Sequence, residues 1–534
     1  MKNVFLPLFC IMLLLNFGCS TQEKDVVDVP RYAANFDSLA AYNEQPDWFQ
    51  DAKLGIYFHW GVYSVPAFGN EWYPRNMHFK DSREYQHHVK TYGEPSEFGY
   101  HDFVPMFKAE NFNADEWATL FKQAGARFAG PVAEHHDGYS MWASKLTPWN
   151  TMDNGPHRDI LGELSKAIKA RDMKLITTFH HERNLQRHDS ISVDGHQIYN
   201  NSHYPFFAGM PPTSDVDSLK YLYGNLPEDM WLEKIWFGKL KEVIDTYQPD
   251  IIWFDSWLDI IPETYRAQFA AYYFNTADSL GKEVVVVRKQ DDLPLDFSVN
   301  DLEKSRMNRI VEKSWMTDET ISYGSWCYTQ DLRIKPTKDI IHVLVDIVSK
   351  NGVLLLNISP MANGTIPQDQ QKVLLEIGDW LQVNGEAIYG TRPWITFGEG
   401  PTKEPEGDFK NHRDFEKIVY TNKDMRYTTK GSDIYATFFG WPDGDSVLLT
   451  TFTPTVIEGD LQIKNISLLG YDGPIDWEKT DHGISIKLPE QKTNDMAVVF
   501  KLETEGNAKL MSFSRELKKK ILEFVSNSLW ENIF

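Results

Sequence analysis

Short apolar runs alternate with longer amphipathic segments through most of this chain. Runs at 54–59, 251–254 and 353–357 have the length and composition of buried strands. Segments such as 161–168 and 368–383 instead repeat apolar residues every three or four positions, as helices do. Continuous apolar strands that alternate with amphipathic helices predict an α/β fold, in which helices cover a parallel sheet.

A closed (β/α)8-like barrel of the TIM type fits this pattern better than an open sheet, because no glycine-rich phosphate loop follows the first strand. We expect the barrel over residues 43–395. Short alternating strands then predict a C-terminal antiparallel β-sandwich over 396–503. Residues 504–534 have the pattern of a helical tail with no assigned role. The polar, aperiodic stretch 185–229 is expected to form a long loop.

The N-terminus has the pattern of an export signal. Lys2 precedes an apolar run at 4–17 that is too short to span a membrane comfortably. Cys19 follows a glycine, which resembles a bacterial lipoprotein signal in which that cysteine is lipidated. We therefore expect a signal peptide at 1–18, a tether at 19–42 and a periplasmic or cell-surface lipoprotein held at the membrane by its anchor. Ordinary signal cleavage nearby is the alternative.

Composition narrows the ligand class. The formal net charge of −22 argues against nucleic acid as a partner, because phosphate backbones would be repelled. Aromatic residues make up 14% of the chain. Most will pack in the core, but aromatic faces also suit the apolar faces of sugars.

Polar side chains interrupt the apolar runs where the predicted strands end. In a (β/α) barrel these ends meet on one face, so residues far apart in the sequence converge on one pocket. The residues at these ends are His59, the run EHHDG at 134–138, His180, Asp255, Arg288 and Asn357.

Asp255 is the strongest candidate for chemistry. It follows Trp253 and Phe254 at the end of an apolar strand. An aspartate here also suits a helix cap, but a carboxylate buried among rings needs compensating partners. Neighbouring histidines and Arg288 would keep it ionised and make it a competent nucleophile.

A carboxylate nucleophile in a retaining glycosidase works with a second carboxyl group about 5–5.5 Å away. Glu303, Glu312 and Glu319 are the candidates. Glu303 follows the strand-like run 297–300, so it repeats the strand-end pattern, whereas the other two lie in less regular sequence. We therefore favour Glu303.

The histidines also allow a metal-dependent hydrolase. His59, His135, His136, His180 and Asp255 would then be ligands. Such barrels commonly begin with a His-x-His pair, which the first strand lacks. We expect no metal and no cofactor, and we expect the histidines to bind sugar hydroxyls instead.

Several motifs together resemble glycoside hydrolase family 29, the α-L-fucosidases. They occur in order from about residue 43 to 395, and a β-sandwich after the barrel is also the layout of that family. The motifs are WFQDAKLGIYFHWG at 48–61, EWY at 71–73, HHDG at 135–138, WFD at 253–255, SW at 325–326, NGVLLLNISP at 351–360 and VNGEAIYG at 383–390.

The resemblance implies an exo-acting retaining α-L-fucosidase that acts on fucosylated oligosaccharides or glycoconjugates. It implies that Asp255 is the nucleophile and forms a covalent fucosyl-enzyme. The substrate-binding residues that it suggests are His59, Glu71, Trp72, His135, His136, His180, Trp253 and Arg288.

One position departs from the family. Many relatives carry Glu after a Trp where this chain has Trp315 and Met316, and methionine cannot transfer a proton. The segment from Asp301 to Arg306 resembles another branch of the family, in which the Glu equivalent to Glu303 is the acid/base. The missing carboxylate motivates one alternative, a non-catalytic or weakly active fucose-binding relative. A hydrolase of a related sugar such as an α-L-galactoside is another.

Overall fold

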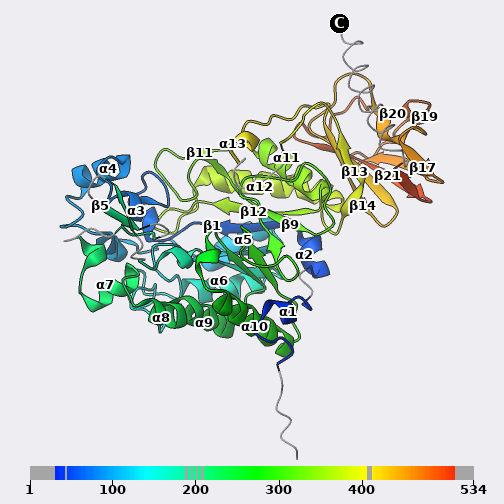
Figure 1. Cartoon of the computed structure of the whole chain (residues 1–534). Helices are drawn as coiled ribbons and strands as arrows, with labels where there is room; N and C mark the ends of the chain where they lie inside the picture. The colour runs from blue at the N-terminus through cyan, green and yellow to red at the C-terminus, as the bar shows by residue number, and fades with distance from the viewer. Residues whose placement is uncertain are drawn as a thin grey trace, which may run out of the picture.

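A barrel of eight parallel strands forms the larger part of the molecule (Figure 1). The computed structural model describes residues 30–42, 45–186, 190–193, 196–199, 202–205, 210–405 and 412–510. The barrel strands, in sheet order, are β8 (Val299–Asn300), β7 (Val285–Arg288), β6 (Ile251–Phe254), β3 (Lys174–Phe179), β2 (Phe128–Glu134), β1 (Leu54–Phe58), β12 (Gly352–Ile358) and β9 (Trp315–Thr320). A parallel bridge between Asp301 and Met316 brings β8 beside β9 and nearly closes the circle. The predicted barrel is confirmed.

Helices surround most of the barrel. The longer ones are α5 (Ala114–Gln123), α6 (Ile160–Lys169), α9 (Gly238–Tyr247), α10 (Glu263–Ser279), α11 (Thr337–Ser349) and α12 (Gln368–Asn384). The links 289–298 and 301–314, both fully described, contain no helix. The repeat is therefore incomplete beside β8. Because these two links form no helix, their backbone can cross the mouth of the barrel.

Shorter elements fill the connections. They are α1 (Phe36–Leu39), α2 (Asp47–Ala52), α3 (Tyr73–Asn76), α4 (Arg83–Thr91), α7 (Asp217–Leu222), α8 (Glu228–Met230), α13 (His412–Phe415) and the two-stranded sheets β4 (Ser190–Val193) with β5 (His196–Tyr199) and β10 (Ser322–Tyr323) with β11 (Arg333–Ile334). The stretch 185–229, expected to be a long loop, thus contains a hairpin and two short helices.

Local sequence explains how α5 is formed and packed. The Asn113 side chain accepts hydrogen bonds from two backbone N–H groups of the first turn and caps the helix. Trp117 and Phe121, four residues apart, bury one face. On α12, a Cβ at Gly378 would lie 2.0 Å from the carbonyl oxygen of Gln123. Glycine at this position therefore lets α12 approach α5 closely.

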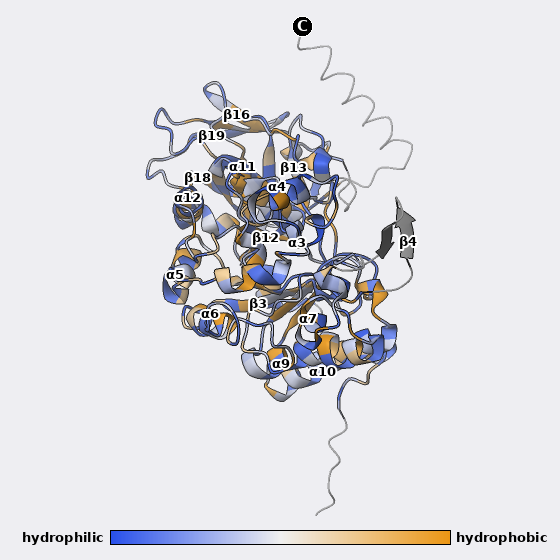
Figure 2. Cartoon of the chain, turned by 90° about the vertical axis from the view of Figure 1, so that its left-hand side faces the viewer, coloured by the Kyte–Doolittle hydropathy of each residue, from blue (hydrophilic) through white to orange (hydrophobic). Residues whose placement is uncertain are grey.

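Strand alternation fixes which side chains face the barrel axis. Tyr57, Trp253, Val287, Met316 and similar residues form an apolar cluster inside the barrel. In Figure 2, hydrophobic colouring is concentrated on the elements inside the molecule, whereas the surface loops are mostly hydrophilic. The next inward positions, two residues further along each strand, reach the mouth of the barrel. This phase places the site described below.

The C-terminal part is a β-sandwich (Figure 1). One sheet has the order β13 (Arg392–Glu399), β14 (Met425–Lys430), β15 (Asp433–Phe438), β21 (Val498–Glu505) and β18 (Gln462–Leu468), a second has β16 (Ser446–Leu449), β20 (Gly483–Lys487) and β19 (Trp477–Thr480), and β17 (Ile457–Gly459) pairs with β22 (Ala508–Leu510). All pairs are antiparallel and enclose their own apolar core. The predicted sandwich is confirmed.

Two boundaries differ from the expected ones. The first sandwich strand begins at Arg392, before residue 396, and residues 508–510 form a strand where the helical tail was expected. The rest of that tail, 511–534, lies outside the described residues.

The segment 30–42, expected to be part of a tether, packs on the barrel. Tyr42 stacks on Phe274 of α10 at a centroid distance of 3.8 Å, and its hydroxyl donates to the carbonyl oxygen of Val284. The predicted signal peptide 1–18 and Cys19 lie outside the described residues. In the part of the chain that is described, no helix is long and apolar enough to cross a membrane.

Candidate active site

A small cavity of about 150 Å³ opens at the carboxyl ends of the barrel strands. It brings together eight residues that the sequence predicted and five that it did not. Its lining is His59, Glu71, Trp72, His135, His136, His180, Asp255, Ser256, Trp257, Lys289, Glu303, Asp318 and Trp326.

Asp255 is held as a carboxylate. Burial opposes its ionisation, but the Lys289 ammonium 3.0 Å from its Oδ1 and the nearby His180 hold its pKa well below the usual range. His136 Nε2 and His180 Nδ1 lie 3.3 and 3.4 Å from its other oxygen. An ionised carboxylate of this kind can act as a nucleophile.

Glu303 has the opposite tendency. Burial, together with the charges of Asp318 and Asp255, raises its pKa, although Lys289 Nζ lies 2.9 Å from its Oε2. Lys289 thus contacts both Asp255 and Glu303, which limits the separation of the two bonded oxygens to about 6 Å. The pair combines an ionised carboxylate with a carboxyl group that retains its proton to higher pH.

Two further aspartates complete the charge balance around Lys289. Asp318 Oδ2 lies 3.3 Å from the ammonium and accepts a hydrogen bond from the Tyr57 hydroxyl. Asp301 is buried behind it, and burial with the charge of Asp318 raises the Asp301 pKa well above its usual range. One ammonium cannot neutralise four carboxylates, so the site disfavours the ionisation of all four together. Asp301 and Glu303 are the two whose pKa values are raised.

The histidines form a neutral wall of hydrogen-bonding groups. Burial lowers the pKa of His59 and His135 well below the usual range, and that of His136 to about 4. Asn357 Oδ1 accepts from the backbone N–H of His59 and lies 2.8 Å from its Nδ1. That contact fixes the ring with Nδ1 protonated and leaves Nε2 as an acceptor. Neutral imidazoles suit ligand hydroxyl groups.

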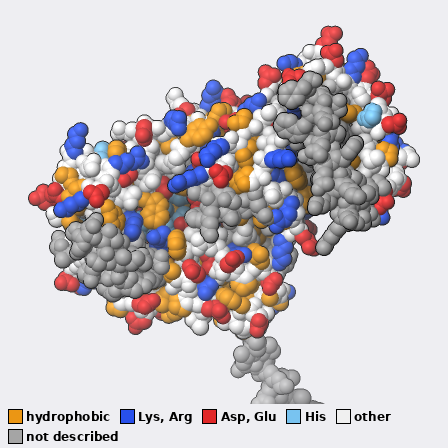
Figure 3. Space-filling model, turned by 45° about the horizontal axis from the view of Figure 1, so that its top comes forward, with side chains coloured by type: hydrophobic (Ala, Val, Ile, Leu, Met, Phe, Trp, Pro, Cys, Tyr) orange, Lys and Arg blue, Asp and Glu red, His pale blue; other side chains and the backbone are white. Residues whose placement is uncertain are grey.

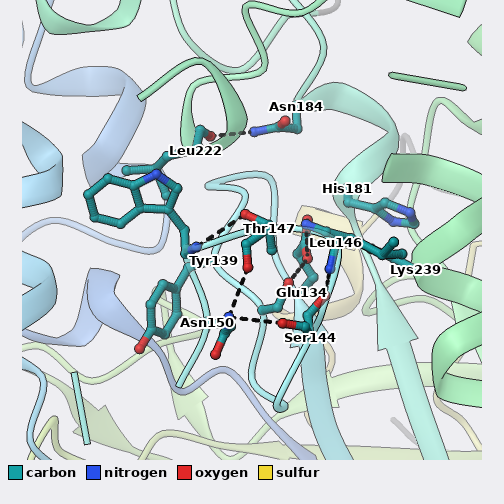
Figure 4. A network of polar contacts seen from close by, with 12 residues as sticks. Glu134, Tyr139, Ser144, Leu146, Thr147, Asn150, His181, Asn184, Leu222 and Lys239 are labelled. Atoms are coloured by element: carbon teal, nitrogen blue, oxygen red, sulfur yellow. Dashed lines mark hydrogen bonds and ion pairs between the residues drawn. The ribbon is translucent and has the colours of Figure 1, made fainter. Parts of the chain in front are cut away.

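A buried polar network supports the double histidine from behind (Figure 4). Glu134 precedes His135, and its carboxylate is fully buried against Lys239 at 2.6 Å and the Ser140 hydroxyl at 2.6 Å. Asn184 Nδ2 donates to the carbonyl oxygen of Leu222. The Glu134 contacts tie the end of β2 to α9 and to the loop after β2, and the Asn184 bond ties the segment after β3 to α7.

Strand phase corrects the prediction for β7. Arg288 does not line the cavity; its guanidinium bonds to Asp291 at 2.7 Å. The inward phase instead runs from Val285 and Val287 to Lys289, which enters the site. Asp318 follows Met316 in the same way on β9. Continuing the two-residue alternation of inward positions past the end of each apolar run predicts both Lys289 and Asp318.

Other predicted residues lie outside the cavity lining. Trp253 lies below it in the barrel interior, and its ring is 4.8 Å from Lys289 Nζ. Glu312 is exposed, and Glu319 faces away and pairs with Lys335 at 2.8 Å. Met316 is buried among apolar side chains inside the barrel. The position that motivated the non-catalytic alternative therefore does not line the cavity.

Two histidine groups have the spacing of metal ligands. Ligand atoms of His59, His135 and His180, and those of His136, His180 and Asp255, lie within 4.8 Å of one another. A cation at the second group would lie close to the Lys289 ammonium, which already neutralises Asp255. At this second group the charge balance therefore favours a neutral polar ligand over a metal ion.

Comparison with known proteins gives a consistent result over most of the chain. The family profile "Alpha-L-fucosidase" matches residues 19–386, and "Alpha-L-fucosidase C-terminal domain" matches 419–503. Tissue alpha-L-fucosidase from Mus musculus is 31% identical over 88% of this chain and 93% of its own length, and the Homo sapiens protein is 30% identical over 90% and 92%. A crystal structure of Thermotoga maritima alpha-fucosidase in complex with fucose superposes with a TM-score of 0.68 at 26% identity, over 88% of this chain and 100% of that one.

Proposed function

Since this chain belongs to the α-L-fucosidase family, we propose that it is an exo-acting retaining α-L-fucosidase that removes terminal α-L-fucose from oligosaccharides or glycoconjugates. The observation that carries the proposal is the pair Asp255 and Glu303, joined through Lys289. Their bonded oxygens are no more than about 6 Å apart and their pKa values are shifted in opposite directions. A separation of about 5–5.5 Å between carboxyl groups is typical of retention.

The geometry supports a two-step reaction. Asp255 attacks the anomeric carbon as the glycosidic bond breaks, and the proton of Glu303 passes to the leaving oxygen. The product is a covalent fucosyl-enzyme. Water then attacks the same carbon, Glu303 takes its proton, and the bond to Asp255 breaks. Two inversions release fucose with its original anomeric configuration.

The cavity itself supports exo action. Its volume of about 150 Å³ is below the roughly 300–1,000 Å³ of drug-sized pockets. The apolar barrel interior closes it below, with Trp253 beneath the Asp255 region. One terminal sugar therefore enters and the remaining glycan stays outside.

The test is the release of 4-nitrophenol from a panel of 4-nitrophenyl glycosides by the purified soluble protein. We expect turnover of the α-L-fucoside, far slower turnover of the D-sugars, and a measurable rate with the α-L-galactoside, which differs from the fucoside by one hydroxyl group. Binding of fucose without turnover of any fucoside, fucosylated oligosaccharides included, would contradict the enzymatic function. Faster cleavage of the α-L-galactoside than of the α-L-fucoside would show that the galactoside is the preferred substrate.

We also propose that the chain is an exported bacterial lipoprotein, signal-processed before Cys19 and held at the membrane through that residue. The support is the basic residue Lys2, the apolar run at 4–17 and the Gly-Cys pair at 18–19. We expect the wild type in the membrane fraction and Cys19→Ala in the soluble fraction. Equal partitioning of the two proteins would contradict the anchor.

A further inference from the structure

Arg183 lies between two tryptophans that line the cavity. Its guanidinium carbon is 4.8 Å from the centroid of the Trp72 ring and 5.2 Å from that of Trp257. The Trp257 side of this stack reaches solvent, because that residue is 37% exposed. Arg183 itself is not part of the cavity lining, but it contacts these two residues of it.

The Arg183 guanidinium has no hydrogen-bond acceptor within the described part of the chain. Among the described residues, none accepts a hydrogen bond from it, and its Nε is buried without a partner. Arginine keeps its charge in proteins, and a buried N–H donor without a partner is costly. Aromatic stacking offsets part of that cost but leaves the in-plane N–H donors unused. Their geometry suits two oxygens of one anionic group.

The acidic neighbours do not satisfy this charge. Asp255 is already neutralised by Lys289 at 3.0 Å. Burial and the charge of Asp255 raise the Glu182 pKa well above its usual range, which disfavours its carboxylate form as a partner for Arg183. Arg75 adds positive charge nearby, since burial and Arg183 lower its pKa to about 10. Arg75 is itself engaged with the carbonyl oxygens of Ser202 and His203.

Trp257 is held in an unfavourable backbone conformation. Its φ of +79° lies in the left-handed region, which is rare for a bulky residue. The backbone N–H of Trp257 donates a hydrogen bond to Gln290 Oε1 at 3.2 Å. Strain of this kind persists where the surroundings impose it and is concentrated at ligand clamps and active sites. Here it places the indole over Arg183.

We propose that Arg183, Trp72 and Trp257 form an anion-binding subsite at the cavity mouth, which takes a sulfate ester or carboxylate carried by the fucosylated substrate. The inference rests on the proposed function. Acidic and basic side chains are interspersed over the face shown in Figure 3, and the net charge is −22. Long-range electrostatic attraction therefore does not draw anions to this protein. An anion would instead be bound by direct, bidentate hydrogen bonds from the Arg183 guanidinium.

The experiment compares matched charged and neutral ligands. Isothermal titration calorimetry would measure binding of methyl α-L-fucoside against its monosulfates, and of α-L-fucosyl-galactose against α-L-fucosyl-galacturonic acid. The first pair places the anion on fucose and the second on the neighbouring sugar. The proteins are the wild type at residue 183, Arg183→Gln and Arg183→Lys, each also carrying Asp255→Gly so that no ligand is hydrolysed during the titration. Arg31→Gln is the control, since Arg31 is exposed, pairs with Asp278 and does not line the cavity.

We expect the wild type to bind the charged member of at least one pair about tenfold more tightly, as charge-assisted hydrogen bonds would give. Arg183→Gln should abolish this ratio, Arg183→Lys should keep a part of it, and Arg31→Gln should leave it unchanged. Added salt should reduce it.

Two outcomes would overturn the subsite: no preference for an anion in either pair, or a preference that persists in Arg183→Gln. Because the readout is binding, a protein that shows the preference but turns over no fucoside would keep the subsite and refute only the enzymatic function. A protein that cleaves fucosides but shows no preference for the charged ligands would keep the enzymatic function and refute the subsite.

Discussion

Replacing Asp255 with glycine is expected to lower kcat/KM for 4-nitrophenyl α-L-fucoside by roughly 10⁴- to 10⁶-fold, the range seen when a covalent nucleophile is removed. The barrel should remain folded, because Lys289 keeps Glu303 and Asp318 as partners at 2.9 and 3.3 Å. Circular dichroism and the thermal midpoint would verify this. The loss should therefore appear in the chemical step.

Azide separates a nucleophile from a residue that only supports the site. In Asp255→Gly the vacated space lets azide attack the anomeric carbon directly, so one inversion should give β-L-fucosyl azide. Nuclear magnetic resonance of the product reads the configuration. A variant that retains more than about one-hundredth of wild-type kcat, a loss smaller than general acid–base effects produce, would rule out Asp255 as the nucleophile.

The sequence predicts the site where strand periodicity continues to the strand end. His59, His180 and Asp255 all fall at inward positions just beyond apolar strands, so convergence on one pocket follows from the barrel alone. The prediction for Arg288 is wrong, because this last residue of β7 does not have the inward phase of Val285 and Val287. Lys289 has the inward phase.

Other parts of the site carry no periodic signal. Glu303 lies on the helix-free link after β8, and its partnership with Lys289 depends on how that link folds across the barrel mouth. Arg183 and Trp257 lie in irregular segments, and their stacking depends on a backbone conformation that no local pattern specifies. Sequence gives the residue types there but not their contacts.

Replacing Glu303 with glutamine is expected to lower kcat/KM about 10²- to 10⁴-fold on natural oligosaccharides, because glutamine cannot supply the proton that the leaving oxygen needs. The loss should be smaller on 4-nitrophenyl fucoside, whose leaving group needs little protonation. Azide should restore turnover and give the α-azide, since the Asp255 intermediate still forms. Glu312→Gln is the matched control, because Glu312 is exposed and does not line the cavity.

The pH profile adds an independent readout of the same role. The raised pKa of Glu303 keeps its proton to higher pH, so wild-type kcat/KM should fall as pH rises through that pKa, and Glu303→Gln should lose this basic limb. The charge of Asp318 contributes to the raised pKa. Asp318→Asn should therefore move the limb to lower pH without removing it. If the fall of kcat/KM at high pH kept its position in Asp318→Asn and also persisted in Glu303→Gln, the general acid would be a residue other than Glu303.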